Sequence, residues 1–96
     1  MDPREAARES VSGNSFGIAN LVKDPLAYLE PLENEKIHPS DIRGRKEPAA
    51  RAGLKALEEA GVVERNGRGY EVKVDWSRED YEEFIDELEF QKDYVL

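Results

Sequence analysis

The chain of 96 residues contains no cysteine, one histidine, one methionine and one tryptophan. Without cysteine it can form neither a disulfide framework nor a thiolate metal site, which fits a reducing, cytoplasmic compartment. No apolar run approaches the ~20 residues that a membrane-spanning helix needs, so we expect no membrane segment. The first residues, MDPREAARES, lack the basic and apolar regions of a signal peptide. The length favours a single domain with a small core.

The sequence also offers little for catalysis. The single histidine, His38, precedes Pro39 in a loop, where we expect it to be solvated or to cap a helix. Carboxylates are numerous, but those of the C-terminal region lie along one solvated helix face. General acid–base catalysis needs two carboxyl groups whose environments give them different pKa values, and exposed neighbours on a helix do not provide this difference. The segment NGRG lacks the lysine and the strand–loop–helix context of a phosphate-binding loop. We therefore predict that the protein is not an enzyme and has no catalytic residue, metal site or cofactor.

Charge is unevenly distributed along the chain. The net charge is −8, from 14 basic and 22 acidic residues, and on its own it opposes binding to phosphates. Residues 43–73 nevertheless carry eight basic and five acidic residues, whereas residues 75–96 carry two basic and nine acidic ones. The middle third is thus basic between acidic flanks. The shortage of lysine relative to Asp and Glu is also common in proteins of salt-loving, halophilic organisms.

The pattern of apolar and turn-forming residues predicts one domain over residues 16–90, a flexible N-terminal arm over 1–15 and a tail over 91–96. Residues 16–32 have helical spacing interrupted at Pro25, which predicts one kinked helix or two short ones. A short helix is expected between Pro39 and Gly44, and a longer one from about Pro48 to Gly61. Gly53 is the exception among strong helix formers in this longer helix.

A β-hairpin and a last helix are expected to follow. Residues 62–65 and 70–74 read as two strands joined at Asn66-Gly67, with Tyr70 and Val72 on the buried face. Ser77 with Asp80 forms a weak capping box, and Trp76 before it is placed to act as a hydrophobic staple. The last helix is amphipathic, and its apolar stripe consists of Tyr81, Phe84, Ile85 and Leu88.

The segment AARAGLKALEEAGVVERNGRGYEV resembles the recognition helix and wing of the winged helix-turn-helix superfamily. In many members a helix ending in Leu-x-x-Leu-Glu-x-x-Gly precedes a short apolar strand and a basic turn. The matching residues here are Leu54, Leu57, Glu58, Gly61, Val62, Val63, Arg65 and Arg68. The resemblance covers about residues 37–74. It implies an α+β, mostly helical fold: a winged helix with three N-terminal helical segments, a two-stranded β-hairpin wing and the C-terminal amphipathic helix.

The resemblance also implies a function in binding double-stranded DNA, as a small transcriptional regulator. The recognition helix of such domains enters the major groove, and the wing contacts the backbone or the minor groove. The predicted DNA-binding residues are Arg43, Arg45, Lys46, Arg51, Lys55, Arg65 and Arg68. The sequence departs from the family pattern in two ways: the spacing from Ile42 to Ala50 is tight, and Glu47, Glu58 and Glu59 accompany the recognition helix.

Two other functions fit the same sequence. The acidic last helix would suit a basic protein partner, as a protein-interaction module or a nucleic-acid mimic, and its apolar stripe would allow a homodimer. A third alternative is an accessory domain whose surface charge is only an adaptation to a cytoplasm of high salt concentration. A basic middle third favours the DNA-binding hypothesis, and an acidic C-terminal helix favours the protein-partner one.

Overall fold

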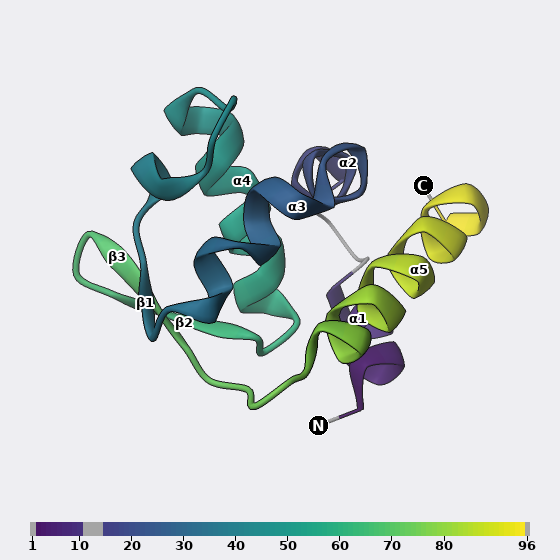
Figure 1. Cartoon of the computed structure of the whole chain (residues 1–96). Helices are drawn as coiled ribbons and strands as arrows, with labels where there is room; N and C mark the ends of the chain where they lie inside the picture. Colours follow the sequence, from purple (N-terminus) through teal and green to yellow (C-terminus); the bar gives the residue numbers. More distant parts are fainter. Residues whose placement is uncertain (1, 11–14, 96) are drawn as a thin grey trace.

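The structure, a computed structural model, describes residues 2–10 and 15–95. It is an α+β fold with mostly helical content and a small antiparallel sheet (Figure 1). The five α-helices of the described residues are α1 (Pro3–Ser10), α2 (Ser15–Lys23), α3 (Pro25–Leu29), α4 (Glu47–Glu59) and α5 (Arg78–Val95). The strands are β1 (Lys36–Ile37), β2 (Val63–Asn66) and β3 (Gly69–Val72). Helix α2 packs against α3, α4 and α5, so it lies at the centre of the helical layer.

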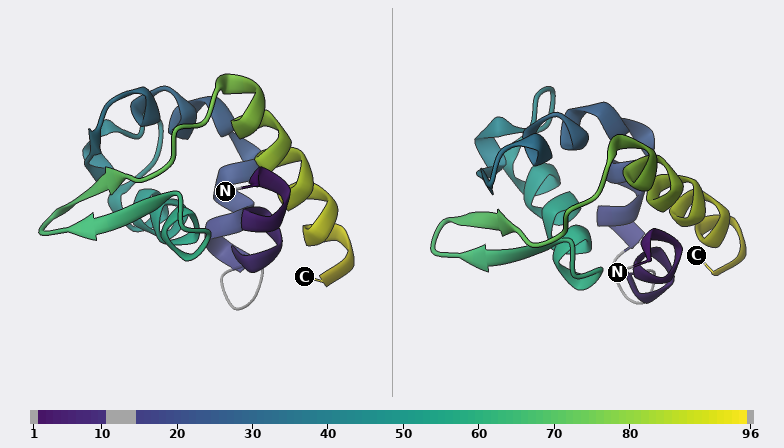
Figure 2. Two further views of the ribbon diagram at one scale, coloured as in Figure 1. Left: turned by 90° about the horizontal axis from the view of Figure 1, so that it is seen from below. Right: turned by 60° about the horizontal axis from the view of Figure 1, so that its bottom comes forward.

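Residues 3–10 differ from the flexible arm that the sequence suggested. They form α1, whose Ala6 and Ala7 are completely buried. Helix α1 packs mainly against α5, and Figure 2 shows the two side by side. The small alanine side chains allow this close packing. The buried face of α1 could not be recognised in the sequence because the residues around these alanines are mostly polar. Of the expected arm and tail, residues 1, 11–14 and 96 lie outside the described residues.

The break predicted at Pro25 is present. Helix α2 ends at Lys23, Asp24 takes an extended conformation, and Pro25 begins α3. Helix α3 ends at Leu29, and Pro31 begins a 3₁₀ turn over Pro31–Glu33. A second 3₁₀ turn, Pro39–Asp41, is the short helix expected before Gly44. Proline suits the first position of both turns because its fixed φ is already helical and its missing N–H would have no partner there.

The sheet has three strands in the order β1-β3-β2, one more than the sequence predicted. Strand β1 was not predicted because two residues are too few to show the alternation of a strand. In the hairpin, Asn66 pairs with Gly69, so the loop consists of Gly67 and Arg68 rather than Asn66 and Gly67. Of these two loop residues, Gly67 alone has a positive φ, +65°, as the first loop residue of a type II′ turn requires. Arg68 is therefore at the tip.

Helix α4 confirms the longer helix expected from the sequence, and its stripe of Ala50, Leu54 and Leu57 is buried. Gly53 has a specific reason to lack a side chain: a β-carbon there would overlap the ring of Tyr28 from α3. The Tyr28 hydroxyl donates a hydrogen bond of 3.2 Å to the carbonyl oxygen of Ala49. Tyr28 is completely buried, so it fixes α3 directly against the backbone of α4.

Helix α5 begins as predicted. The Asp80 amide donates to the Ser77 hydroxyl and the Ser77 amide to the Asp80 carboxylate, which completes the capping box. Trp76 packs edge-on against Tyr81, with ring centroids 5.3 Å apart, so the expected staple is present. The stripe of Tyr81, Phe84, Ile85 and Leu88 is buried against the other helices. The helix continues to Val95, through most of the region expected to be a tail.

A buried carboxylate joins α1 to α5. The side chain of Glu87 is 7% exposed and lies 3.6 Å from Arg4 and 3.5 Å from Arg8. It also accepts a hydrogen bond of 2.9 Å from Gln91. The hydrogen bond from Gln91 lowers the pKa of Glu87, burial opposes the shift, and the two arginines add to the lowering.

We expect Gly53→Ala to destabilise the protein by about 1–3 kcal/mol, the usual cost of overpacking, although alanine is the better helix former by about 1 kcal/mol. Urea unfolding gives the change in the free energy of unfolding. In a Tyr28→Leu background the overlap is absent, so the same substitution should be neutral or stabilising there. A stability gain from Gly53→Ala in the unmodified chain would contradict the packing described above. Lys55→Ala, at an exposed position of the same helix, is the control.

Glu87 should make stability depend on pH. Because its pKa is lower in the folded chain than in the unfolded one, its contribution is present above about pH 4.3 and is lost as pH falls through the folded-state pKa. The difference in unfolding free energy between the unmodified chain and Glu87→Gln should therefore be larger at pH 7 than at pH 3. Glu89→Gln, at an exposed position of the same helix, is the control. A pH-independent effect of Glu87→Gln would refute the assignment.

Candidate nucleic-acid interface

An open groove of about 430 Å³ lies between α4 and the β-hairpin. Three of the seven predicted DNA-binding residues line it: Arg51 and Lys55 from α4 and Arg65 from β2. The remaining lining residues are Pro48, Ala52, Glu58 and Tyr70. Lys55 and Arg65 are exposed, so their charged groups are available at the surface. The fold thus brings together basic residues that are separated by up to fourteen positions in the sequence.

The geometry of the two elements explains this convergence. Arg51 and Lys55 are four residues apart and so share one face of α4. On β2, Arg65 lies on the same sheet face as Val63, which is buried, because alternate residues of a strand point the same way. Its partner across the ladder is the buried Tyr70. Arg65 therefore extends beyond the edge of the core on the side that faces α4.

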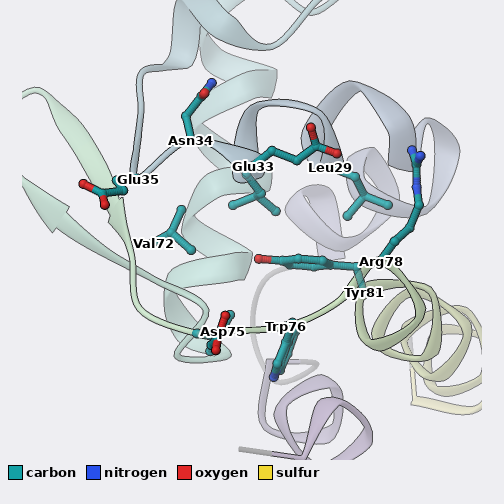
Figure 3. A pocket seen from close by; sticks show the side chains of 11 residues that line it. Leu29, Glu33, Asn34, Glu35, Val72, Asp75, Trp76, Arg78 and Tyr81 are labelled. Atoms are coloured by element: carbon teal, nitrogen blue, oxygen red, sulfur yellow. The ribbon is translucent and has the colours of Figure 1, made fainter.

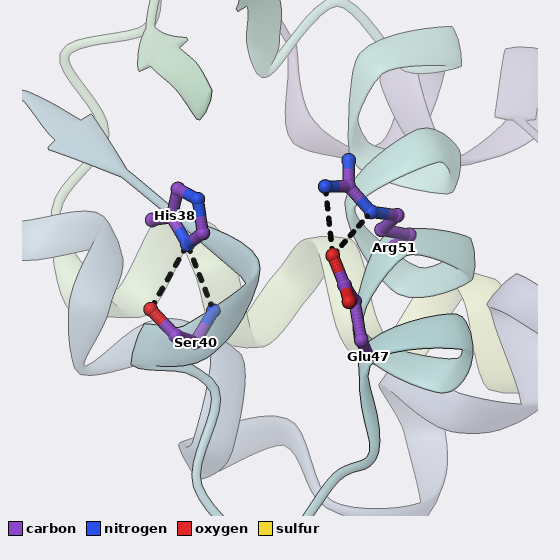
Figure 4. Close-up of polar contacts among 4 residues, drawn as sticks. All are labelled: His38, Ser40, Glu47 and Arg51. Carbon is purple, nitrogen blue, oxygen red and sulfur yellow. Dashed lines mark hydrogen bonds and ion pairs between the residues drawn. The ribbon is translucent and has the colours of Figure 1, made fainter. Parts of the chain in front are cut away.

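Arg51 is already engaged within the protein. Its Nε and Nη2 atoms donate hydrogen bonds of 3.0 and 2.9 Å to the same carboxylate oxygen of Glu47, one helical turn earlier (Figure 4). The side chains are 36% and 65% exposed, so water and salt screen this pair. Glu47 thus holds the guanidinium at the groove and partly neutralises it. The sequence marked Glu47 only as an unfavourable charge and did not indicate this pairing.

Arg45 has a structural position that the sequence did not reveal. It is half-buried, donates 3.2 Å to the Gly44 carbonyl oxygen, and its Nε is buried without a hydrogen-bond partner among the described residues. Burial raises the pKa of the Tyr28 hydroxyl, and the charge and hydrogen bond of Arg45 partly oppose this rise. The charged group of Arg45 therefore acts on the Tyr28 hydroxyl, at the contact between α3 and α4, and does not line the groove.

The remaining predicted residues lie around the groove or away from it. Arg68 is exposed at the hairpin tip, and Lys46 is exposed at the position that caps α4. Arg43 lines a separate hollow together with two acidic residues, Glu30 and Asp41. The structure therefore separates Arg43 and Arg45 from the basic residues of α4 and the hairpin, although all of them are close in sequence.

The acidic residues of α5 lie at the other end of the molecule. Figures 1 and 2 show the hairpin projecting from one end and α5 forming the opposite one. The exposed carboxylates of α5 are Glu79, Glu82, Glu83, Asp86 and Glu89. Helix α5 packs against α1, α2 and α3. Its negative charge is consequently remote from the groove, and the acidic composition of the whole chain does not describe the surface near α4.

His38 caps a turn, one of the two roles expected for it. Its Nδ1 accepts from the Ser40 amide at 3.2 Å and lies 2.9 Å from the Ser40 hydroxyl (Figure 4). The His38 amide in turn donates to Asp41, completing a capping box. Over residues 2–10 and 15–95, no group of three or more His, Asp or Glu side chains is arranged to hold a metal ion. Nor is any helix in that part of the chain long and apolar enough to cross a membrane.

No protein-family model, curated protein or solved structure matches this chain significantly.

Arg45 and Arg43 should respond differently to truncation. We expect Arg45→Ala to lower the free energy of unfolding by about 1 kcal/mol, because the half-buried side chain and its interaction with the Tyr28 hydroxyl are lost. Arg43→Ala, at an exposed position, should change stability by less than about 0.5 kcal/mol. Urea unfolding of both variants tests this difference. Equal effects would mean that Arg45 has no special structural role.

Proposed function

We propose that this protein binds double-stranded DNA through α4 and the β2–β3 hairpin, as a small winged-helix transcriptional regulator. The observation that carries the proposal is the groove in which Arg51, Lys55 and Arg65 converge. In this proposal α4 is the recognition helix, the hairpin is the wing, and Arg68 at its tip contacts the backbone or the minor groove. Lys46 supplies a further phosphate contact beside the start of α4.

The order of the elements supports the winged-helix assignment. A helical segment, strand β1, a short helix, α4 and then the hairpin follow one another along the chain. Strand β1 pairs with β3 and so connects the segment before α4 to the wing. The tight spacing before α4 is accommodated by the 3₁₀ turn Pro39–Asp41, which takes the place of a full second helix.

The placement of charge supports DNA as the partner. A duplex attracts clustered cations and is repelled by carboxylates within roughly a Debye length, which is about 8 Å at physiological salt. The exposed carboxylates of α5 are at the end of the molecule opposite the hairpin. Glu58 lines the groove and Glu47 pairs with Arg51 beside it, and these two carboxylates act against binding there. We infer that the basic end approaches the duplex while the acidic end faces away.

One observation favours a second function, an interaction with a basic protein. A hollow of about 240 Å³ between α3 and α5 combines Leu26, which is 54% exposed, with Glu82 and Asp86. Apolar area beside carboxylates suits a basic amphipathic segment. The apolar stripe of α5, which suggested a homodimer, is buried against the chain's own helices. A dimer through α5 would therefore have to use the outer face of that helix.

Fluorescence anisotropy with a labelled duplex tests the DNA-binding proposal. We expect saturable binding whose logarithmic affinity falls with the logarithm of salt concentration, with a slope that decreases by about 0.9 for each lost phosphate contact. Arg51→Ala, Lys55→Ala and Arg65→Ala should each weaken binding and reduce that slope. Lys23→Ala, an exposed cation on α2, is the matched control and should do neither. The proposal would be rejected if no duplex bound, or if Lys23→Ala lowered the affinity for DNA as much as the groove variants do.

Removing the carboxylate beside Arg51 should have the opposite effect. Glu47→Gln keeps the size of the side chain but removes its charge, so Arg51 becomes free to contact a phosphate. We expect affinity for duplex to rise by about three- to tenfold at low salt, with a steeper salt dependence. Glu59→Gln, an exposed acid at the far end of α4, should change affinity less. An unchanged or weaker affinity for Glu47→Gln would show that the pair is needed to position Arg51.

A further inference from the structure

A second concave site lies between the end of β3, the 3₁₀ turn Pro31–Glu33 and the start of α5 (Figure 3). Its volume is about 320 Å³, at the lower end of the range for small-molecule sites. The apolar residues that line it are Leu29, Leu32, Val72, Val74, Trp76 and Tyr81. The polar residues are Glu33, Asn34, Glu35, Asp75 and Arg78. None of these residues lines the groove at α4, so this pocket is separate from the proposed DNA interface.

Two aromatic rings form one wall of the pocket. Trp76 and Tyr81 are held at 5.3 Å between centroids with their planes at 72°, and Trp76 also packs 5.4 Å from Phe84. The staple at the start of α5 fixes both rings in place. Aromatic faces held in this way attract a cation within about 6 Å through their quadrupole.

Among the described residues the only buried side-chain polar atom without a hydrogen-bond partner is Arg45 Nε, so the hydroxyl of Tyr81 is open to the pocket and its water. Tyr81 as a whole is only 8% exposed, and Figure 3 shows its ring extending from α5 into the pocket with the hydroxyl foremost. Phenylalanine would complete the staple equally well, so the hydroxyl is available for a contact with a bound ligand. Burial raises the pKa of this hydroxyl, so it stays protonated and is able to donate or accept one hydrogen bond.

The rim of the pocket is acidic. Three of its lining residues, Glu33, Glu35 and Asp75, are carboxylates, and one, Arg78, is a cation. In the view of Figure 3, Glu35 points away from Tyr81, whereas Asp75 and Trp76 lie together on one side of its ring. The charge of the rim repels anions and, with the aromatic wall, favours a positively charged ligand. Its apolar floor favours a ligand with a hydrophobic body.

We propose that this pocket binds a small organic cation, a primary ammonium carried on an apolar body about the size of an aromatic ring. The ammonium lies beside Asp75 and the face of Trp76, and the hydroxyl of Tyr81 exchanges water for a hydrogen bond to the ligand. The apolar body fills the space between Leu29, Leu32 and Val72. This site goes beyond the proposed DNA binding and does not depend on it.

Trp76 makes the proposal directly testable because it is the only tryptophan of the chain and lines the pocket. Titration with phenethylamine should change its fluorescence saturably, with a dissociation constant below about 1 mM. The matched probes are 2-phenylethanol, which is neutral, and phenylacetate, which is anionic; we expect each to bind at least tenfold more weakly. Equal affinity for the neutral alcohol, or no saturable change with the amine, would overturn the proposal.

Substitutions of residues that line the pocket test whether phenethylamine binds there. Tyr81→Phe retains the staple but removes the hydroxyl, and we expect a loss of affinity for phenethylamine of about three- to tenfold. Asp75→Asn should also lower the affinity for phenethylamine, whereas the small fluorescence change caused by 2-phenylethanol should stay the same. Glu89→Gln, which removes an acid of α5 outside the pocket, should alter neither. Isothermal calorimetry checks the affinities independently of fluorescence. Undiminished amine binding in both Tyr81→Phe and Asp75→Asn would contradict the assigned site.

Discussion

The contact between Tyr28 and the backbone of α4 is the constraint on which the proposed interface depends. The ring occupies the space that a side chain at position 53 would take, and its hydroxyl bonds to the Ala49 carbonyl oxygen. Together with the extensive packing of α2 on α4, this contact fixes where α4 lies in the helical layer. Because the stripe around Leu54 then faces the core, the opposite side of α4, with Arg51 and Lys55, is presented toward the hairpin.

The molecule separates its charges between two ends. Basic residues gather where α4 meets the hairpin, and five exposed carboxylates of α5 lie at the other end. In an acidic chain this separation is what makes binding to a polyanion physically reasonable, since exposed charges act only over about a Debye length of 8 Å. The same separation leaves α5 and the pocket at Trp76 available for other ligands. Two functions on one small domain are therefore compatible.

Local signals predicted the elements well, whereas contacts between distant residues were not predictable. Proline and glycine positions marked the break at Pro25 and the end of α4, and the spacing of Phe84 and Leu88 indicated the buried face of α5. Helix α1 and strand β1 were missed because they are short and depend on partners far along the chain. At the candidate site, the cluster of basic residues was visible in the sequence, but three-dimensional contacts removed Arg45 from it and paired Arg51 with Glu47.

The central claim is that the groove between α4 and the hairpin receives duplex DNA while α5 faces away. Mapping amide chemical shifts in ¹⁵N-labelled protein on addition of duplex tests it most directly. We expect the changes to concentrate in residues 46–55 and 65–69, with the exposed face of α5 unaffected. Changes concentrated on α5, or the absence of any change at a saturating concentration of duplex, would contradict the account.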